Sequence, residues 1–171
     1  MGKPVPMTTK PFDEIYTPDY AIKPLIPYID KGLVIWENAY GTGLLAKHLR
    51  KVGYKVVGNA NIDFLKEYCE CDVIVTNPPY SIKEKFLQRA FELGKPFAFL
   101  LPLTTLEGQK RGKLFADKGI QLIIPNRRIN FIYDNAKSAS WFSTAWFTWK
   151  LKLPKDLLFV QMERLPPKEV E

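Results

Sequence analysis

The turn at residues 76–80, Thr-Asn-Pro-Pro-Tyr, has the most specific chemical pattern in the sequence and directly follows a β-type run that begins at Asp72. Its two prolines fix the backbone and remove two N–H donors, so the turn presents carbonyl oxygens. The side-chain carbonyl of Asn77 and the main-chain carbonyl of Pro78 could together accept both hydrogens of a planar amine, while the ring of Tyr80 stacks on its plane. The structural alternative is a Pro-Pro loop that leads into a helix, because Pro and Asn are common in turns.

A glycine turn is the second candidate site. Glu37 ends the apolar run 33–37, and Gly41-Thr42-Gly43 follows it. Glycine allows the backbone to approach a bound ligand closely. A Gly-x-Gly turn is as often a tight connection as a ligand-binding turn. Its position after a strand is therefore what indicates a ligand site here.

Both turns belong to an α/β pattern, in which apolar runs alternate with amphipathic segments and a helical layer covers each face of the sheet. Strands are expected at residues 33–37, 54–58, 72–77, 96–103, 120–125, 127–133 and 143–151, and helices at 17–30, 44–53, 81–94 and 112–119. The last two strands are expected to pair as a hairpin across residues 134–142. A sheet of this kind binds its ligand beyond the carboxyl ends of its strands, where the strand order reverses.

The helix ends are predicted from their capping residues. Thr17 and Ser81 are placed as N-caps, and Gly53 and Gly94 are expected to close the helices that precede them. Residues 1–12 are expected to form a loose arm and residues 164–171 a tail.

Length and composition indicate one globular domain. The 171 residues are 46% hydrophobic and 25% charged, a balance that argues against a disordered or fibrous chain. No apolar run approaches the roughly 18 residues of a membrane span, and the first residues carry no signal-peptide pattern, so we expect an intracellular protein. With Cys69, Cys71 and one histidine, the sequence excludes a disulfide scaffold and argues against a metal site of the zinc type.

The positive charge is unevenly distributed along the chain. Residues 1–80 contain nine basic and nine acidic groups, whereas residues 81–171 contain 16 basic and 9 acidic groups. The formal excess of seven charges therefore lies in the second half. Such an excess suits a polyanionic partner, since Lys and Arg displace counterions from phosphates, although it also serves solubility.

Taken together, these turns resemble those of S-adenosylmethionine-dependent amino-methyltransferases of the adenine-N6 DNA type, whose catalytic motif is Asn-Pro-Pro-Tyr. The resemblance runs from Tyr16-Thr-Pro through the turns 37–43 and 77–80 to the aromatic C-terminal strands, and is greatest to small phage- and prophage-type members. It implies a Rossmann-like class I methyltransferase fold, a three-layer α/β sandwich with a mostly parallel sheet and an antiparallel C-terminal hairpin. Residues 1–171 would form a single domain without a separate target-recognition domain.

The resemblance also implies the cofactor and the partners. S-adenosylmethionine would supply the methyl group, and DNA, with RNA as an alternative, would be the substrate. A separate specificity subunit would provide target recognition if this chain does not, and no membrane is involved. The expected location is the cytoplasm, including that of a host cell if the protein is encoded by a virus.

Site residues follow from the same resemblance. The catalytic residues would be Asn77, Pro78, Pro79 and Tyr80. The cofactor-binding residues would be Tyr16, Thr17, Pro18, Glu37, Asn38, Ala39, Gly41, Gly43, Asn59, Asp63, Phe64 and Asn77. Candidates for contact with nucleic acid are Lys110, Arg111, Arg127, Arg128 and Lys137.

The chain departs from the family pattern around the cofactor. Asn38 stands where the family has Pro, and Tyr40 stands where it has a smaller residue. The acid that the family places after the second strand to hold the ribose hydroxyls is absent, so this contact is either missing or made by Asn59, Asn61 or Asp63. The connection from there to the catalytic strand is also short.

Two alternatives therefore stay open. The same catalytic turn serves enzymes that methylate RNA adenines or the side-chain amide of a protein glutamine. The second alternative is a protein that has the methyltransferase fold but has lost its cofactor and binds nucleic acid. Trp146, Trp149 and His48 are expected to be structural, and both cysteines to be reduced thiols.

Overall fold

The computed structural model describes residues 15–133 and 142–163 of the chain. The predicted arm and tail lie outside these ranges, as does Lys137.

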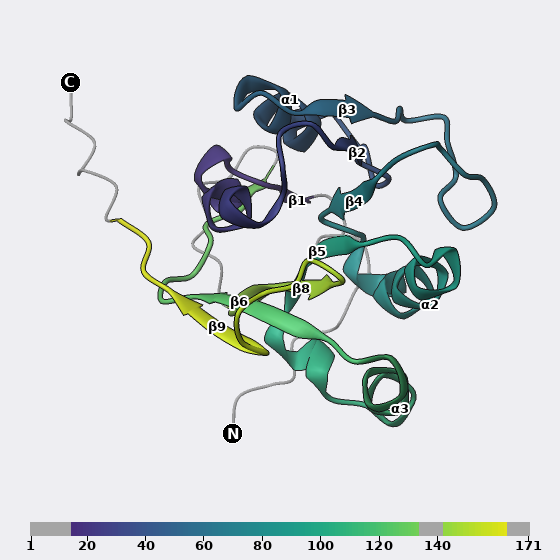
Figure 1. The fold of residues 1–171 in the computed structure, drawn as a ribbon, viewed down its shortest axis with the longest axis vertical. Coiled ribbons are helices and arrows are strands. Elements are labelled where there is room, and N and C mark those ends of the chain that lie inside the picture. The colour runs from purple at the N-terminus through teal and green to yellow at the C-terminus, as the bar shows by residue number, and fades with distance from the viewer. Residues whose placement is uncertain (1–14, 134–141, 164–171) are drawn as a thin grey trace.

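Seven strands among the described residues form one sheet in the order β3-β2-β4-β5-β8-β6-β9 (Figure 1). Their bounds are β2 Val34–Trp36, β3 Lys55–Val57, β4 Val73–Thr76, β5 Phe97–Pro102, β6 Gln121–Pro125, β8 Thr144–Trp149 and β9 Leu157–Val160. All neighbouring pairs are parallel except those of β8, which runs antiparallel to both β5 and β6. The predicted α/β architecture is confirmed, including antiparallel pairing near the C-terminus.

The predicted pairing of strand 127–133 with strand 143–151 is wrong. Only Ile132–Tyr133 is extended in this segment (β7), and it pairs with β1, Ile15–Tyr16, in a separate two-stranded sheet. β8 instead enters the centre of the main sheet, where six residue pairs join it to β5. The alternation of apolar residues in β8 predicts a strand but does not choose its neighbours.

Helices cover both faces of the sheet (Figure 1). The 3₁₀ helix η1 (Asp19–Tyr28) and α1 (Leu44–Lys51) lie on one side, and α2 (Lys83–Leu93) and α3 (Gln109–Lys118) on the other. Adjacent residues of β8 show the two layers: the indole N–H of Trp146 donates to the carbonyl oxygen of Ala21 at 2.8 Å, while Phe147 packs near Phe115 of α3. Successive strand residues point to opposite faces, so the central strand contacts both helical layers.

Two predicted helix N-caps are corrected. The first helix begins after Pro18, without a side-chain cap from Thr17, and it is 3₁₀ over its length. Pro24 and Pro27 inside it lack the N–H groups that an α-helix requires. The predicted cap Ser81 instead lies within the 3₁₀ turn η2 (Tyr80–Ile82), and α2 starts only at Lys83.

The glycine ends are confirmed. Gly94 closes α2 in the left-handed conformation at φ 70°, and Gly53 follows the end of α1 with φ 101°. Such positive φ values strain every residue with a side chain.

An aromatic cluster fills the core beneath the helix α2. Phe64 packs against Trp36 and Phe86, with ring centroids 5.2 and 4.9 Å apart, and Phe97 and Phe99 continue the cluster on β5. Trp146 is fully buried, as predicted, and Trp149 is partly buried. Cys69 and Cys71 are free thiols.

One connection of the fold agrees with the sequence, and one strand was missed. The segment 58–72 between β3 and β4 contains no helix or strand, in agreement with the short connection that the sequence indicates. Strand β9 at the edge of the sheet was missed, and it leaves Leu157 and Phe159 exposed. None of the described helices is long and apolar enough to cross a membrane.

Candidate functional site

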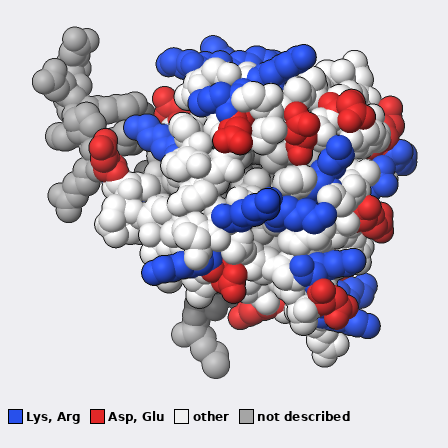
Figure 2. Space-filling view, in the orientation of Figure 1, with Lys and Arg blue, Asp and Glu red and all other residues white. Residues whose placement is uncertain are grey.

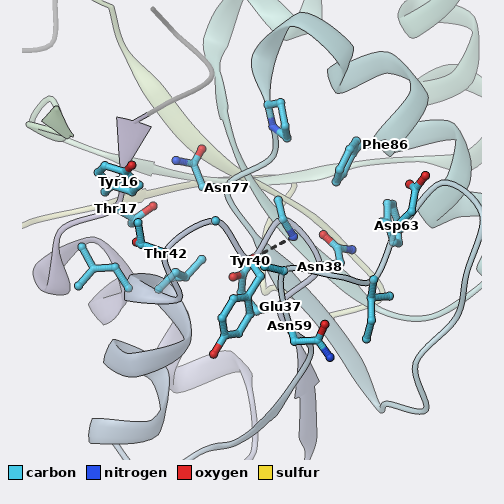
Figure 3. A pocket seen from close by; sticks show the side chains of 18 of the residues that line it. Tyr16, Thr17, Glu37, Asn38, Tyr40, Thr42, Asn59, Asp63, Asn77 and Phe86 are labelled. Carbon is cyan, nitrogen blue, oxygen red and sulfur yellow. Dashed lines mark hydrogen bonds between the residues drawn. The ribbon is translucent and has the colours of Figure 1, made fainter. Parts of the chain in front are cut away.

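A cavity of about 380 Å³ opens at the carboxyl ends of β2 and β4 (Figure 3). β2 and β4 are neighbours in the sheet; the connection after β2 leads to β3 on one side, whereas the connection after β4 leads to β5 on the other. This is the reversal of strand order at which open α/β sheets bind ligands. Figure 3 shows Tyr16 and Thr17 at one end of the cavity, Asp63 and Phe86 at the other, and Asn38 between them.

Glu37 is the buried acid of the site. Its carboxylate is 1% exposed, and Oε1 accepts hydrogen bonds from the Thr76 hydroxyl at 2.5 Å and from the Ala39 N–H at 3.0 Å. Oε2 is buried and has no hydrogen-bond partner in the protein. Thr76 is the last residue of β4 and Glu37 follows β2, so the parallel pairing of these strands brings the two together.

Burial governs the protonation of Glu37. Removal from water raises the pKa of this carboxyl from 4.5 to about 7, against the opposing effect of the two hydrogen bonds from Thr76 and Ala39. A cation placed against Oε2 would favour the ionised form. The site therefore has an acid that a positively charged ligand can ionise.

The glycine turn is shaped by close backbone approaches. Gly43 starts α1 with φ 79°, its N–H donates to the carbonyl oxygen of Tyr40 at 2.7 Å, and the Tyr40 ring lies where a Cβ of Gly43 would be. The Tyr40 hydroxyl accepts a hydrogen bond from Arg50 on α1. Tyr40 is thus folded against its own turn and α1.

Gly58 fixes the distance between β2 and β3 at the cavity. A Cβ on this residue would lie 2.4 Å from the carbonyl oxygen of Glu37, and its φ is 121°. The ends of the two strands can come this close only because residue 58 is glycine.

The Asn-Pro-Pro-Tyr turn lies beside Glu37, after β4. Oδ1 of Asn77 is buried without a hydrogen-bond partner, and both Asn77 and Pro79 line the cavity. Pro78 is buried outside the lining, and Tyr80 is 7% exposed with its ring edge-on to Phe142 at 5.8 Å. The structure therefore brings Asn77 and Pro79 to the cavity, whereas Pro78 and Tyr80 are buried outside its lining.

The far end of the cavity is formed by the segment after β3. Phe64 is buried, whereas Asp63 is exposed and forms an ion pair with Lys66 at 3.2 Å. Hydrogen bonds from the Leu65 N–H and from Lys66 lower the pKa of Asp63. Asn59 is exposed, and its Oδ1 accepts a hydrogen bond from the Asn61 N–H at 2.8 Å.

Most of the predicted cofactor residues line this one cavity. These are Tyr16, Thr17, Glu37, Asn38, Ala39, Gly41, Asn59, Asp63, Phe64 and Asn77, whereas Pro18 and Gly43 lie outside the lining. Sequence reasoning missed Ile15, Thr42, Leu44, Leu45, Ala60, Ile62, Leu65, Ile82 and Phe86. Most of these are apolar, and nothing in their pattern separates a cavity wall from a core position.

The basic candidates for nucleic-acid contact are spread over the fold. Arg111 donates to the carbonyl oxygen of Thr105 at 2.9 Å and to Glu84 at 3.3 Å, and Lys110 lies 3.8 Å from Glu84. Arg127 and Arg128 are exposed after β6, at the same edge of the sheet as the cavity. Figure 2 shows adjoining basic side chains along the top of the molecule, over α1 and β3, and interspersed basic and acidic side chains over the rest of that face. In the described ranges no group of His, Cys, Asp and Glu is arranged to hold a metal ion.

Comparison with known proteins supports the fold. No model of a protein family matches the sequence, and no curated protein matches it. The structure is similar to the methyltransferase subunit of a type I restriction-modification system from Streptococcus thermophilus, with a TM-score of 0.58 and 18% identity over 90% of this chain and 48% of that one. This chain spans about half the length of that subunit.

Two other solved structures share the architecture. A protein from Listeria monocytogenes assigned to the class I S-adenosylmethionine-dependent methyltransferases has a TM-score of 0.55 and 16% identity, over 89% of this chain and 67% of that one. A protein from Pyrococcus horikoshii assigned as an RNA methyltransferase has a TM-score of 0.51 and 16% identity, over 86% and 91% of the two chains. The chain therefore has the Rossmann-like fold of the class I methyltransferases.

Proposed function

We propose that this protein transfers a methyl group from S-adenosylmethionine to the exocyclic amine of adenine in DNA. The observation that carries the proposal is the position of Asn77: it begins the Asn-Pro-Pro-Tyr turn, and its carbonyl oxygen is buried without a partner beside the cavity. An acceptor in that state is ready for an amine hydrogen. Proteins of this fold include both a restriction-modification subunit and a protein assigned as an RNA methyltransferase, so the test below includes both DNA and RNA.

The residues of the cavity fit S-adenosylmethionine. Oε2 of Glu37 is a buried carboxylate oxygen without a partner, which suits the ammonium group of the methionine moiety. Phe64 and Phe86 provide an apolar wall at the opposite end for the adenine ring. A volume of about 380 Å³ is within the range of ligand pockets. When bound, this cofactor supplies an electrophilic methyl group on a sulfonium.

Positioning is the main task of the protein in this reaction. The lone pair of the adenine amine is delocalised into its ring, and acceptance of its hydrogens by Asn77 and by the carbonyl oxygen of Pro78 favours a more tetrahedral nitrogen. That nitrogen can then attack the methyl group in line, and orientation of this kind can lower a barrier by several kcal/mol. A base within a duplex cannot reach the turn, so the substrate is flipped out or single-stranded.

The test is methyl transfer from labelled S-adenosylmethionine to DNA and RNA oligonucleotides of mixed sequence, followed by mass spectrometry of the nucleosides. We expect N6-methyladenine in DNA. Asn77→Ala should reduce transfer at saturating S-adenosylmethionine by at least about 100-fold, with thermal melting as the check that the variant is folded. If methylated adenine appears only in RNA, the proposal that DNA is the substrate is wrong. Full activity of Asn77→Ala would refute the mechanism.

The competing interpretation is that the protein no longer binds the cofactor. It is based on Asn38, Tyr40 and the short segment 58–72, which depart from the family pattern around the cofactor. Calorimetric titration of the wild-type protein with S-adenosylmethionine and S-adenosylhomocysteine separates the two. We expect micromolar binding. A folded protein that binds neither compound would contradict the proposed enzyme and favour a nucleic-acid-binding protein.

A further inference from the structure

The carboxamide of Asn38 is a buried polar group without a role in the reaction described so far. Asn38 is 7% exposed, and neither its Oδ1 nor its Nδ2 has a hydrogen-bond partner in the protein. Native proteins keep few buried polar groups in this state, because each loses its bonds to water without replacement. Asn38 also lines the cavity, so a ligand there can provide the missing partners.

The position of Asn38 indicates which part of a ligand it meets. Glu37, on one side of it, carries the free carboxylate oxygen that suits a cation, while Phe64 and Phe86 form the apolar wall at the other end. Figure 3 shows Asn38 between the turn after β2 and the end marked by Asp63 and Phe86. A ligand with an ammonium group at one end and a planar ring at the other would place its middle against Asn38.

We propose that Asn38 binds the vicinal hydroxyl groups of the cofactor ribose, with Nδ2 donating to one hydroxyl oxygen and Oδ1 accepting from the other hydroxyl. A carboxamide has one donor group and one acceptor on the same plane, which matches two adjacent hydroxyls. The inference rests on the proposed function, because it requires a nucleoside cofactor in this cavity.

The other polar residues considered for this contact are engaged elsewhere. Oδ1 of Asn59 accepts the Asn61 N–H at 2.8 Å, and the Asp63 carboxylate accepts the Leu65 N–H and pairs with Lys66. Asn61 itself is not part of the cavity lining. Asn38 is buried and neither end of its amide has a partner in the protein, whereas Asn59 and Asp63 are exposed to water, so the need for a ligand partner is greater at Asn38.

The test is a thermodynamic cycle that combines a variant with altered ligands. Wild type and Asn38→Ala are titrated with S-adenosylhomocysteine, its 2′-deoxy and 3′-deoxy analogues, and its inosine analogue, which replaces the adenine amine. Gln88→Ala, which removes an exposed carboxamide on α2, is the matched control. Thermal melting checks that each variant is folded.

In the wild type, we expect removal of either hydroxyl to weaken binding about 3- to 10-fold, and Asn38→Ala to weaken binding of the intact ligand by a similar factor. In Asn38→Ala, the deoxy analogues should bind within about 2-fold of the intact ligand, because the contact is already gone. Gln88→Ala should behave as the wild type.

Four results would overturn the assignment or the proposed function on which it rests. Equal penalties for the deoxy analogues in the wild type and in Asn38→Ala would show that Asn38 does not contact the hydroxyls. Coupling to the inosine analogue alone would assign Asn38 to the adenine edge. If the wild type binds none of the ligands, the proposed function itself fails. If Asn38→Ala does not fold, unchanged wild-type affinity for the deoxy analogues would still refute the ribose contact.

Discussion

At the scale of single residues, the site contains polar atoms that the protein buries and leaves without partners. Oε2 of Glu37, the amide of Asn38 and Oδ1 of Asn77 all belong to this group. They follow two adjacent parallel strands, so the sheet itself brings them together. Because unsatisfied buried groups reduce stability, this arrangement favours a ligand that supplies a cation and hydrogen-bonding groups.

Glu37 should make stability depend on pH. Its folded-state pKa of about 7 lies above the value of 4.5 for the free side chain. The folded protein therefore holds this proton more tightly, and the free energy of unfolding should fall as the pH rises from about 4.5 to 7. Glu37→Gln should be more stable than wild type at pH 8, by up to roughly 3 kcal/mol, with the difference shrinking towards pH 5. Urea unfolding at both pH values measures this, and a difference that does not vary with pH would contradict it.

The same group should link cofactor binding to pH. An ammonium group against Oε2 needs the ionised carboxylate, so the affinity for S-adenosylhomocysteine should rise between pH 6 and pH 8, with proton release that is detectable in buffers of different ionisation enthalpy. In Glu37→Gln this proton release should disappear and the affinity should fall about 10-fold or more. Persistent proton release in the variant would point to another group.

Single residues also show how far the sequence predicts the site. Asn77 and Glu37 could be found because each stands at the end of an apolar run, whereas Asp63 could be found only through the resemblance to the family. Phe86 could not, since its place on the apolar face of α2 is typical of any core residue. The burial of Tyr80 depends on its contact with Phe142, which lies 62 positions later in the chain and is not visible in local patterns.

At the scale of elements, the junction of β2 and β3 depends on glycine. A Cβ at position 58 would lie 2.4 Å from the carbonyl oxygen of Glu37, whereas a Cβ at position 53 would meet no atom within 4 Å. Both residues have positive φ, at 121° and 101°. Substitution of Gly53 tests the effect of the backbone conformation on stability. Substitution of Gly58 tests that effect together with the close approach to Glu37.

We expect Gly53→Ala to lower the free energy of unfolding by about 1 kcal/mol and Gly58→Ala by about 2 kcal/mol or more beyond that. Gly58→Ala should also weaken binding of S-adenosylhomocysteine, because it displaces the turn that carries Glu37. Urea unfolding and calorimetry measure the two effects. Equal destabilisation by both substitutions would show that the backbone at Glu37 yields easily.

The contact between α2 and α3 depends on one arginine. Arg111 is half-buried and joins Thr105 and Glu84, whereas the neighbouring Lys110 is exposed and 3.8 Å from Glu84. Arg111→Ala should lower the free energy of unfolding by about 1–2 kcal/mol, and Lys110→Ala by less than about 0.5 kcal/mol. If the two variants are equally stable, the partly buried hydrogen bonds of Arg111 contribute nothing measurable.

Elements were predicted better than their ends and partners. The periodicity of the runs identified the strands of the sheet and the helices. The prolines of η1 marked an interruption, but the change to a 3₁₀ helix over its whole length depends on packing against β6 and β8. The partners of β7 and the existence of β9 depend on contacts between distant segments, for which the sequence carries no local signal.

At the scale of the whole molecule, the two ends of the parallel strands differ in their relation to the site. Arg127 and Arg128 follow the carboxyl end of β6, and the cavity also lies at the carboxyl ends of the strands. Lys152 and Lys155 precede the amino end of β9, on the opposite side of the sheet from the cavity, and all four side chains are exposed. A nucleic acid that reaches Asn77 would pass near the first pair only.

Arg127→Ala combined with Arg128→Ala should therefore weaken DNA binding and reduce the slope of log affinity against log salt concentration by about two ions. The combination of Lys152→Ala and Lys155→Ala changes charge by the same amount and should leave that slope nearly unchanged. Fluorescence anisotropy at several salt concentrations compares them. Equal effects of the two double variants would indicate binding by net charge alone.

The antiparallel strand β8 has a consequence for how the protein is made. It occupies the centre of the sheet, between β5 and β6, yet it is among the last elements along the chain. A nascent chain that has emerged only as far as residue 140 contains both neighbours but lacks the strand that joins them. Until β8 emerges, only β3, β2, β4 and β5 can pair on the ribosome, and β6 has neither of its sheet neighbours, because β9 follows β8 in the chain. Because distant contacts of this kind form slowly, chaperones that hold apolar strands during synthesis would have a long interval in which to bind.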